Sequence, residues 1–90
     1  MAKQVSFQPK AWDEFMSWQN DKKTQKRIFE LIKEIGRDPF NGKGKPEPLK
    51  HKKSGCWSRR IDDTNRLVYE VTDTAVVIYS CKHHYGDLVR

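Results

Sequence analysis

A glycine- and proline-rich segment separates two parts of this chain that follow different structural patterns. Residues 41–49 read NGKGKPEPL, and the two glycines and two prolines exclude a continuous helix there. Apolar residues recur at helical spacing before this segment, and strand-like runs follow it. Because 90 residues provide a core for one domain and no room for a second, we expect a single α+β domain over residues 1–90.

The first part predicts a short strand and a helix. Gln4–Phe7 alternates as a strand does and stops before Pro9, a residue favoured in the first turn of a helix. Trp12, Phe15 and Met16 then recur at helical spacing. We expect this apolar stripe to lie in the core.

A second helix follows. Asp21 is a suitable N-cap, and Gly36 and Pro39 are expected to end the helix, with a loop over 37–53 after it. Between them, apolar residues follow the spacing of one helix face, which we also expect in the core. These residues are Ile28, Leu31, Ile32 and Ile35.

The second part predicts three strands. Runs at 56–61, 66–72 and 75–81 are separated by turn-forming residues at 62–65 and 73–74. Short turns join antiparallel neighbours. We therefore expect a small antiparallel sheet with the two N-terminal helices packed on one face, and the other face open for function.

Basic residues are concentrated in the segment that links the helices to the strands. The chain carries a formal charge of +6, and seven Lys and Arg residues surround a single carboxylate, Glu47, within residues 41–60. They are Lys43, Lys45, Lys50, Lys52, Lys53, Arg59 and Arg60. Such a segment suits nucleic acid, an acidic protein or an anionic surface. A charge that serves solubility alone is the alternative.

The central strand contributes an arginine to the open face. If Leu67 points toward the helices, Arg66 points away from them. A turn at 62–64 would place Arg60 beside Arg66, and two arginines at that distance repel unless an anion lies between them. Ion pairs with neighbouring Asp and Glu residues are the alternative interpretation.

Two histidines and a tyrosine follow the last strand, at His83, His84 and Tyr85. Isolated histidines are more often surface or core residues, and no metal-ligand spacing is present. Across a basic groove from Glu47, an imidazole would instead offer a proton donor opposite a proton acceptor. With an arginine between them, such a pair suits RNA cleavage through the 2′-hydroxyl, which supplies its own nucleophile. No metal or cofactor is therefore expected.

The two cysteines and the N-terminus bear on where the protein works. Cys56 and Cys81 lack the spacing of a redox motif or zinc site and predict reduced, buried thiols. The first ten residues, MAKQVSFQPK, contain no apolar run of the kind found in signal peptides, and no run is long enough to span a bilayer. We expect a cytoplasmic protein without membrane contact.

Longer motifs make the chain recognisable. It resembles the YoeB toxins, the Txe/YoeB group of the RelE superfamily, across residues 4–85. The matching runs are DPF at 38–40, GKGKPEPLK at 42–50, GCWSRRI at 55–61, NRLVYEV at 65–71 and the final His84-Tyr85. The resemblance implies a ribosome-dependent endoribonuclease that cuts mRNA in the A site. It also implies inhibition by a YefM-like antitoxin, DNA contact only through the antitoxin complex, and a homodimer.

The resemblance also implies roles for individual residues. By position, Glu47 matches the general base, His84 the general acid and Arg66 the arginine that stabilises the transition state. The residues that match or are expected to contact substrate are Lys43, Lys45, Lys50, Arg60 and Tyr85. The chain departs from the family at Lys82-His83, which replaces a basic–aromatic pair, and in the tail at 86–90.

Two other functions compete with the endonuclease. A non-catalytic module that binds RNA or the ribosome could use the same basic surface. A DNA-binding regulator is disfavoured, because nothing in the sequence resembles a helix-turn-helix.

Overall fold

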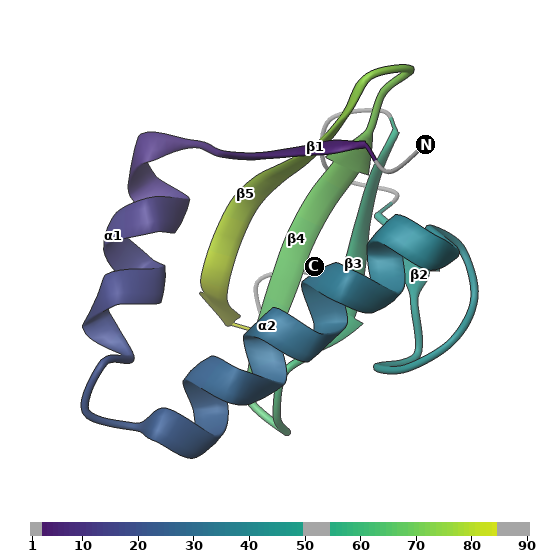
Figure 1. Cartoon of the computed structure of the whole chain (residues 1–90). Helices are drawn as coiled ribbons and strands as arrows, with labels where there is room; N and C mark the ends of the chain where they lie inside the picture. The colour runs from purple at the N-terminus through teal and green to yellow at the C-terminus, as the bar shows by residue number, and fades with distance from the viewer. Residues whose placement is uncertain (1–2, 50–54, 85–90) are drawn as a thin grey trace.

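The computed structural model describes residues 3–49 and 55–84 of the chain (Figure 1). Within these residues, a strand and two helices precede four further strands. The elements are β1 (Gln4–Phe7), α1 (Pro9–Ser17), α2 (Lys22–Arg37), β2 (Glu47–Pro48), β3 (Cys56–Arg60), β4 (Asn65–Val71) and β5 (Ala75–His84). The prediction of an α+β fold with two N-terminal helices is confirmed.

The strands form one sheet in the order β1-β5-β4-β3-β2. β3, β4 and β5 pair antiparallel, as predicted, and β2, which was not predicted, pairs antiparallel with β3. β1 instead runs parallel to β5, with Val5 opposite Val76. The prediction of a purely antiparallel sheet is therefore wrong at this edge. Parallel neighbours need a long connection, and the two helices and the meander between β1 and β5 supply it.

Helix α1 begins where predicted, but only part of its apolar stripe is buried. Ala11 is inaccessible to solvent and Phe15 packs against the core, whereas Trp12 is 48% exposed and Met16 is 40% exposed. The prediction that Trp12 and Met16 lie in the core is wrong. The helix lies beside β5 near the edge of the sheet (Figure 1), so only one of its sides meets other elements. Trp12 contacts Phe7 instead, with 5.5 Å between the ring centroids.

Helix α2 is capped as predicted. The Asp21 carboxylate accepts a hydrogen bond from the backbone N–H of Thr24 at 3.0 Å, and the predicted isoleucine and leucine stripe is buried. The helix continues through Gly36 and ends at Arg37, with Asp38 as its C-cap. Gly36 therefore does not end the helix, because a glycine in the last turn costs too little to break it.

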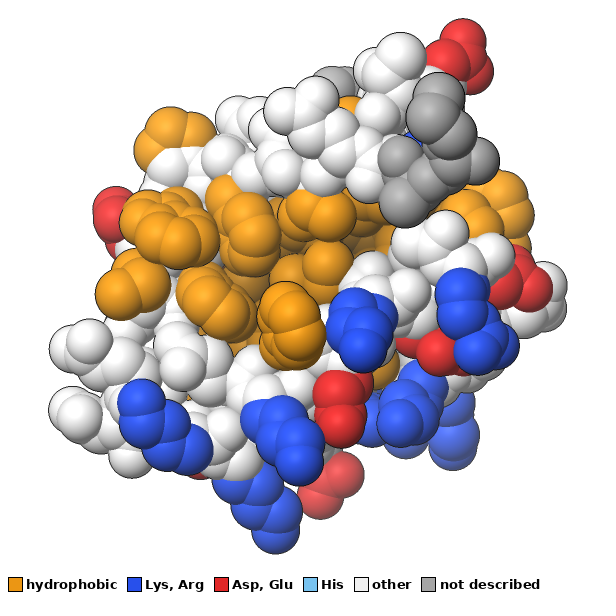
Figure 2. All heavy atoms as spheres, in the orientation of Figure 1, with side chains coloured by type: hydrophobic (Ala, Val, Ile, Leu, Met, Phe, Trp, Pro, Cys, Tyr) orange, Lys and Arg blue, Asp and Glu red, His pale blue; other side chains and the backbone are white. Residues whose placement is uncertain are grey.

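One core lies between the helices and the sheet. Leu67 and Tyr69 of β4 are buried in it and Val71 packs against it, which confirms their predicted orientation. Figure 2 shows the helix side of the molecule, where apolar side chains gather between the helices and Lys and Arg side chains lie along α2. A smaller buried cluster of Cys56 and Val68 lies on the opposite face of the sheet.

Strand β2 lies inside the segment predicted as a loop over 37–53. Its Glu47 pairs with Ser58 of β3, and its Pro48 cannot donate to the ladder, so it suits a short edge strand. With a proline on each side of Glu47, the segment shows no alternation of apolar and polar residues, so the sequence pattern did not predict a strand there. At the other side of the sheet, β5 continues to His84, beyond its predicted end at 81.

Candidate functional site

Three predicted site residues come together on the face of the sheet opposite the helices. Glu47 lies directly opposite Ser58, and Arg60 lies directly opposite Arg66. Directly opposed residues share a face, and so do residues two apart along a strand. Since Ser58 and Arg60 are two apart on β3, the side chains of Glu47, Arg60 and Arg66 share this face. We call it the open face.

The two histidines take different positions at the end of β5. His83 pairs with Arg66 and is half-buried, whereas His84 pairs with Asn65 and is exposed. Alternation along the strand therefore puts His83 on the open face with Arg66. The family motif selects His84, so its role as general acid stays a prediction. Of the other predicted contacts, Lys50 and Tyr85 lie outside the described residues.

Arg66 is anchored to the turn that precedes its strand. Its side chain is nearly inaccessible, with the residue 3% exposed, and Nη1 donates to the carbonyl oxygens of Asp62 at 2.6 Å and Asn65 at 3.2 Å. Burial tends to raise the pKa of the Asp62 carboxyl. Hydrogen bonds from Asn65 and Thr64, together with the charge of Arg66, outweigh burial and lower that pKa below its usual range. The Asp62 carboxylate thus stays charged and orders the turn that holds the guanidinium.

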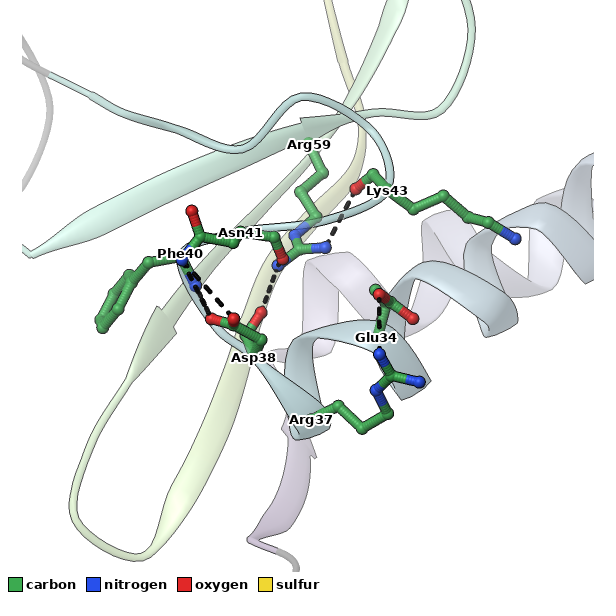
Figure 3. A network of polar contacts seen from close by, with 7 residues as sticks. All are labelled: Glu34, Arg37, Asp38, Phe40, Asn41, Lys43 and Arg59. Atoms are coloured by element: carbon green, nitrogen blue, oxygen red, sulfur yellow. Dashed lines mark hydrogen bonds and ion pairs between the residues drawn. The ribbon is translucent and has the colours of Figure 1, made fainter.

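Arg59 was grouped with the phosphate-binding cations, and the structure corrects this interpretation. Arg59 is fully buried on the helix side of the sheet. Its guanidinium donates to the carbonyl oxygens of Asp38 at 2.6 Å, Lys43 at 2.9 Å and Asn41 at 3.0 Å (Figure 3). Its Nε donates to the Tyr69 hydroxyl at 3.1 Å. A buried cation is tolerated because its donors are satisfied. Arg59 therefore fixes the loop that leads to β2.

Tyr69 adds a second anchor to the same loop. Its hydroxyl donates to the carbonyl oxygen of Pro39 at 2.7 Å while accepting from Arg59. Burial raises the pKa of Tyr69, although the hydrogen bond and charge of Arg59 oppose that effect. The phenol therefore remains protonated and donates, which ties the loop to the centre of the sheet.

The loop also passes close to α2 at Gly44. This residue has a φ of +85°, and a Cβ atom there would lie 2.9 Å from Leu31 Cδ2 and 3.0 Å from Arg59 Cβ. The carbonyl oxygen of Gly44 accepts from the backbone N–H of Arg60 at 2.7 Å. The next residue, Lys45, has a φ of 49°. The backbone just before Glu47 is thus closely constrained, while the Lys43 and Lys45 side chains are exposed.

Trp57 faces the helix side of the sheet, away from the open face. It pairs with Tyr69 and packs against the core on the helix side, with its ring 4.8 Å from that of Phe40. Alternation from Arg60 would have predicted this orientation. Trp57 is therefore a core residue.

Ser58 was not predicted as a site residue, although alternation from Arg60 would have placed it on the open face. It is 1% exposed, and its Oγ has no hydrogen-bond partner among the residues that the structure describes. It lies between Glu47 on β2 and Val68 on β4. Polar side chains this deeply buried normally have a partner.

Cys56 and Cys81 are buried on strands and unlinked, as predicted. Across residues 3–49 and 55–84, no three His, Cys, Asp or Glu side chains come together in a group that could hold a metal ion. Neither described helix is long and apolar enough to cross a membrane.

The whole pattern of the chain matches one family of bacterial proteins. Residues 7–85 fit the family model of the YoeB-like toxin of bacterial type II toxin–antitoxin systems. A protein with this fold and this match is a toxin of a type II toxin–antitoxin system. Toxin YoeB of Escherichia coli K12 is 57% identical over 76 residues, which cover 83% of this chain and 90% of that protein. The chain belongs to the YoeB-like toxin family.

Solved structures agree with this assignment. The YoeB dimer from Staphylococcus aureus is 45% identical and superposes with a TM-score of 0.89, covering 94% of this chain and 100% of that one. The toxin in the heterotetrameric YoeB–YefM complex of the same organism is also 45% identical, with a TM-score of 0.84 and the same coverage.

Proposed function

We propose that this toxin is a ribosome-dependent endoribonuclease that cuts mRNA in the ribosomal A site. The observation that carries the proposal is the placement of Glu47, Arg60 and Arg66 on one face of the sheet, in a chain of the YoeB-like family. A carboxylate on the same face as two guanidinium groups offers a base within an anion-binding surface. The exposed Lys43 and Lys45 side chains extend that surface along the preceding loop.

The proposed reaction needs only the groups of the protein and the RNA. Glu47 removes the proton from the 2′-hydroxyl, the 2′-oxygen bonds to the adjacent phosphorus, and the bond to the 5′-oxygen breaks. His84 donates a proton to that leaving oxygen, while Arg66 stabilises the charge on the phosphoryl oxygens. The 2′-oxygen is the nucleophile, so the reaction requires no metal ion. The products carry a 2′,3′-cyclic or 3′-phosphate and a 5′-hydroxyl.

Arg66 suits this role because its guanidinium is held before substrate arrives. The carbonyl oxygens of Asp62 and Asn65 fix Nη1, so the charge need not be reorganised during the reaction. Arg60, Lys50 and Tyr85 are proposed to bind the phosphates and the base.

The test uses ribosomes programmed with an mRNA that carries a 2′-deoxy nucleotide at the cleavage site. Cleavage should stop, because the nucleophile is missing, while binding to the ribosome should hardly change. The matched control is the same mRNA with the 2′-deoxy substitution several codons away. A protein that binds both substrates but cuts neither would be the non-catalytic ribosome-binding module instead.

We also propose that a YefM-like antitoxin covers the open face, that the toxin forms a homodimer, and that it contacts DNA only through the antitoxin complex. Toxins of this family from S. aureus are found both as a YoeB dimer and in a YoeB–YefM complex. An acidic antitoxin segment would complement the basic loop before β2. Hydrogen exchange should show protection of residues 43–66 and 82–85 on antitoxin binding. Inhibition with no change in either region would place the interface elsewhere.

A further inference from the structure

Ser58 combines two properties that seldom occur together: deep burial and an unmet hydrogen-bonding group. The residue is 1% exposed and its Oγ finds no partner within the described part of the chain. A buried hydroxyl without a partner destabilises a fold, because it has lost its bonds to water. Because such a group contributes nothing to stability, its retention suggests a partner that the hydroxyl acquires when the protein acts.

The nearest functional side chain in the register is Glu47. Directly opposed residues of an antiparallel pair have Cβ atoms about 4.5–5.5 Å apart, and Ser58 is directly opposite Glu47. Glu47 is exposed, and its carboxylate has no hydrogen bond or ion pair within residues 3–49 and 55–84. At that Cβ separation, side-chain rotation is expected to bring the hydroxyl and a carboxylate oxygen within hydrogen-bonding reach. The same face carries Arg60 and Arg66 one step further along the strands.

We propose that Ser58 is a positioning residue for the general base. When RNA occupies the open face, the Ser58 hydroxyl donates a hydrogen bond to one oxygen of the Glu47 carboxylate. The other oxygen is then directed at the 2′-hydroxyl. The bond also favours the ionised carboxylate, which is the form that accepts the proton. This inference rests on the proposed function, because it gives Ser58 a role only if Glu47 is the base.

A space-filling role for Ser58 predicts the opposite behaviour on substitution. If the residue only filled its site, alanine would serve as well or better, because it fits the space and removes an unsatisfied hydroxyl. A positioning hydroxyl predicts that alanine preserves or raises stability and still impairs the reaction. Only the positioning role therefore predicts that Ser58→Ala keeps or gains stability while its cleavage activity falls.

The variant Ser58→Ala tests this directly. We expect an unchanged or higher Tm, unchanged ribosome binding, and single-turnover cleavage slowed about 10- to 100-fold, the effect of losing one hydrogen bond to a charged group. The acidic limb of the pH–rate profile should shift to higher pH, because the carboxylate then gains a proton more readily. Ser58→Cys keeps the size and a weaker donor, so its rate should fall between those of the wild type and Ser58→Ala.

Ser80→Ala is the matched control. Ser80 is also buried on a strand, at 2% exposed, but its hydroxyl donates to Glu14 at 2.8 Å. We expect that variant to lose stability and to keep the pH–rate profile of the wild type.

Two outcomes would overturn the inference: a Ser58→Ala variant with the wild-type rate and pH–rate profile, or one whose Tm falls as far as that of Ser80→Ala. Failure of the proposed function looks different. In that case Glu47→Gln cuts as fast as the wild type, or the wild type does not cut at all.

Discussion

At the scale of single residues, alternation along the strands determines which side chains share the open face. The register puts Glu47, Arg60 and Arg66 there. It also pairs His83 with Arg66, whereas the family motif points to His84. Consecutive residues at a strand end face opposite ways, so one of the two histidines is expected to act as the acid.

Substitution of each histidine separates the two possibilities. We expect His84→Gln to lower single-turnover cleavage by about two to four orders of magnitude, the range for loss of a general acid. His83→Gln should keep most of the activity. Both variants should fold, because both side chains lie at the end of a strand, which circular dichroism would check. A dead His83 variant beside an active His84 variant would transfer the role of acid to His83.

Arg59 is the residue whose role changes most between the sequence and the fold. We predict that Arg59→Met lowers the free energy of unfolding by at least about 3 kcal/mol, because the carbonyl oxygens of the loop and the Tyr69 hydroxyl lose their buried donor. Urea unfolding measures this. Arg60→Met is the matched control: Arg60 is exposed, so its stability change should stay within about 0.5 kcal/mol. Equal losses in both variants would contradict the buried role of Arg59.

At the scale of elements, the loop between α2 and β2 determines where Glu47 lies. The C-terminus of α2 leads directly into it, and the contacts of Arg59, Tyr69 and Gly44 hold it against the sheet. The two-residue strand β2 depends on this support, because β3 is its only neighbour among the strands that the structure describes. Perturbing the loop should therefore move the base while leaving the helices in place.

Gly44→Ala tests this dependence. The new Cβ would collide with Leu31 and Arg59, and a φ of +85° is unfavourable for alanine. We expect stability to fall by about 1–3 kcal/mol and cleavage to fall more than ribosome binding. Gly36→Ala is the control, because no atom lies within 4 Å of its added Cβ and alanine favours the helix. A fully active Gly44→Ala would show that the loop does not position Glu47.

At the scale of the whole molecule, Cys81 and Tyr69 are acids of the described core that resist ionisation. Burial raises the pKa of the Cys81 thiol from 9.0 to about 12, and the Glu14 carboxylate adds to that effect. Burial likewise raises the pKa of Tyr69 above 10.0. The folded state thus favours the protonated forms. Their contribution to stability is complete below pH 9 and is lost as pH rises toward about 12.

We therefore predict that the free energy of unfolding declines steadily above pH 9. Urea unfolding at a series of pH values would measure the decline. Cys81→Ala should be less stable at neutral pH, because it leaves a small void, but should lose less stability between neutral and alkaline pH. An identical alkaline decline in both proteins would show that Cys81 does not titrate as described.

The sequence by itself determined the classes of structure and the toxin family. Apolar periodicity predicted α2 and the meander, because burial of one face imposes a period of about 3.6 residues on a helix and about two on a strand. The motifs around Glu47 and Arg66 identified the family because they are long and specific. Alternation also predicted that Arg60 and Arg66 would be neighbours, since a short turn sets the register.

Only the tertiary structure decided which cations are available to a ligand and which belong to the core. Arg59 and Arg60 are adjacent in the sequence, yet one is buried by the loop and the other is exposed. Burial depends on what packs above a strand, and here that is a loop from residues 38–44, far along the chain. The parallel pairing of β1 with β5 and the placement of Ser58 opposite Glu47 likewise depend on long-range contacts. Local residue patterns do not encode such contacts, because they form only when distant segments meet.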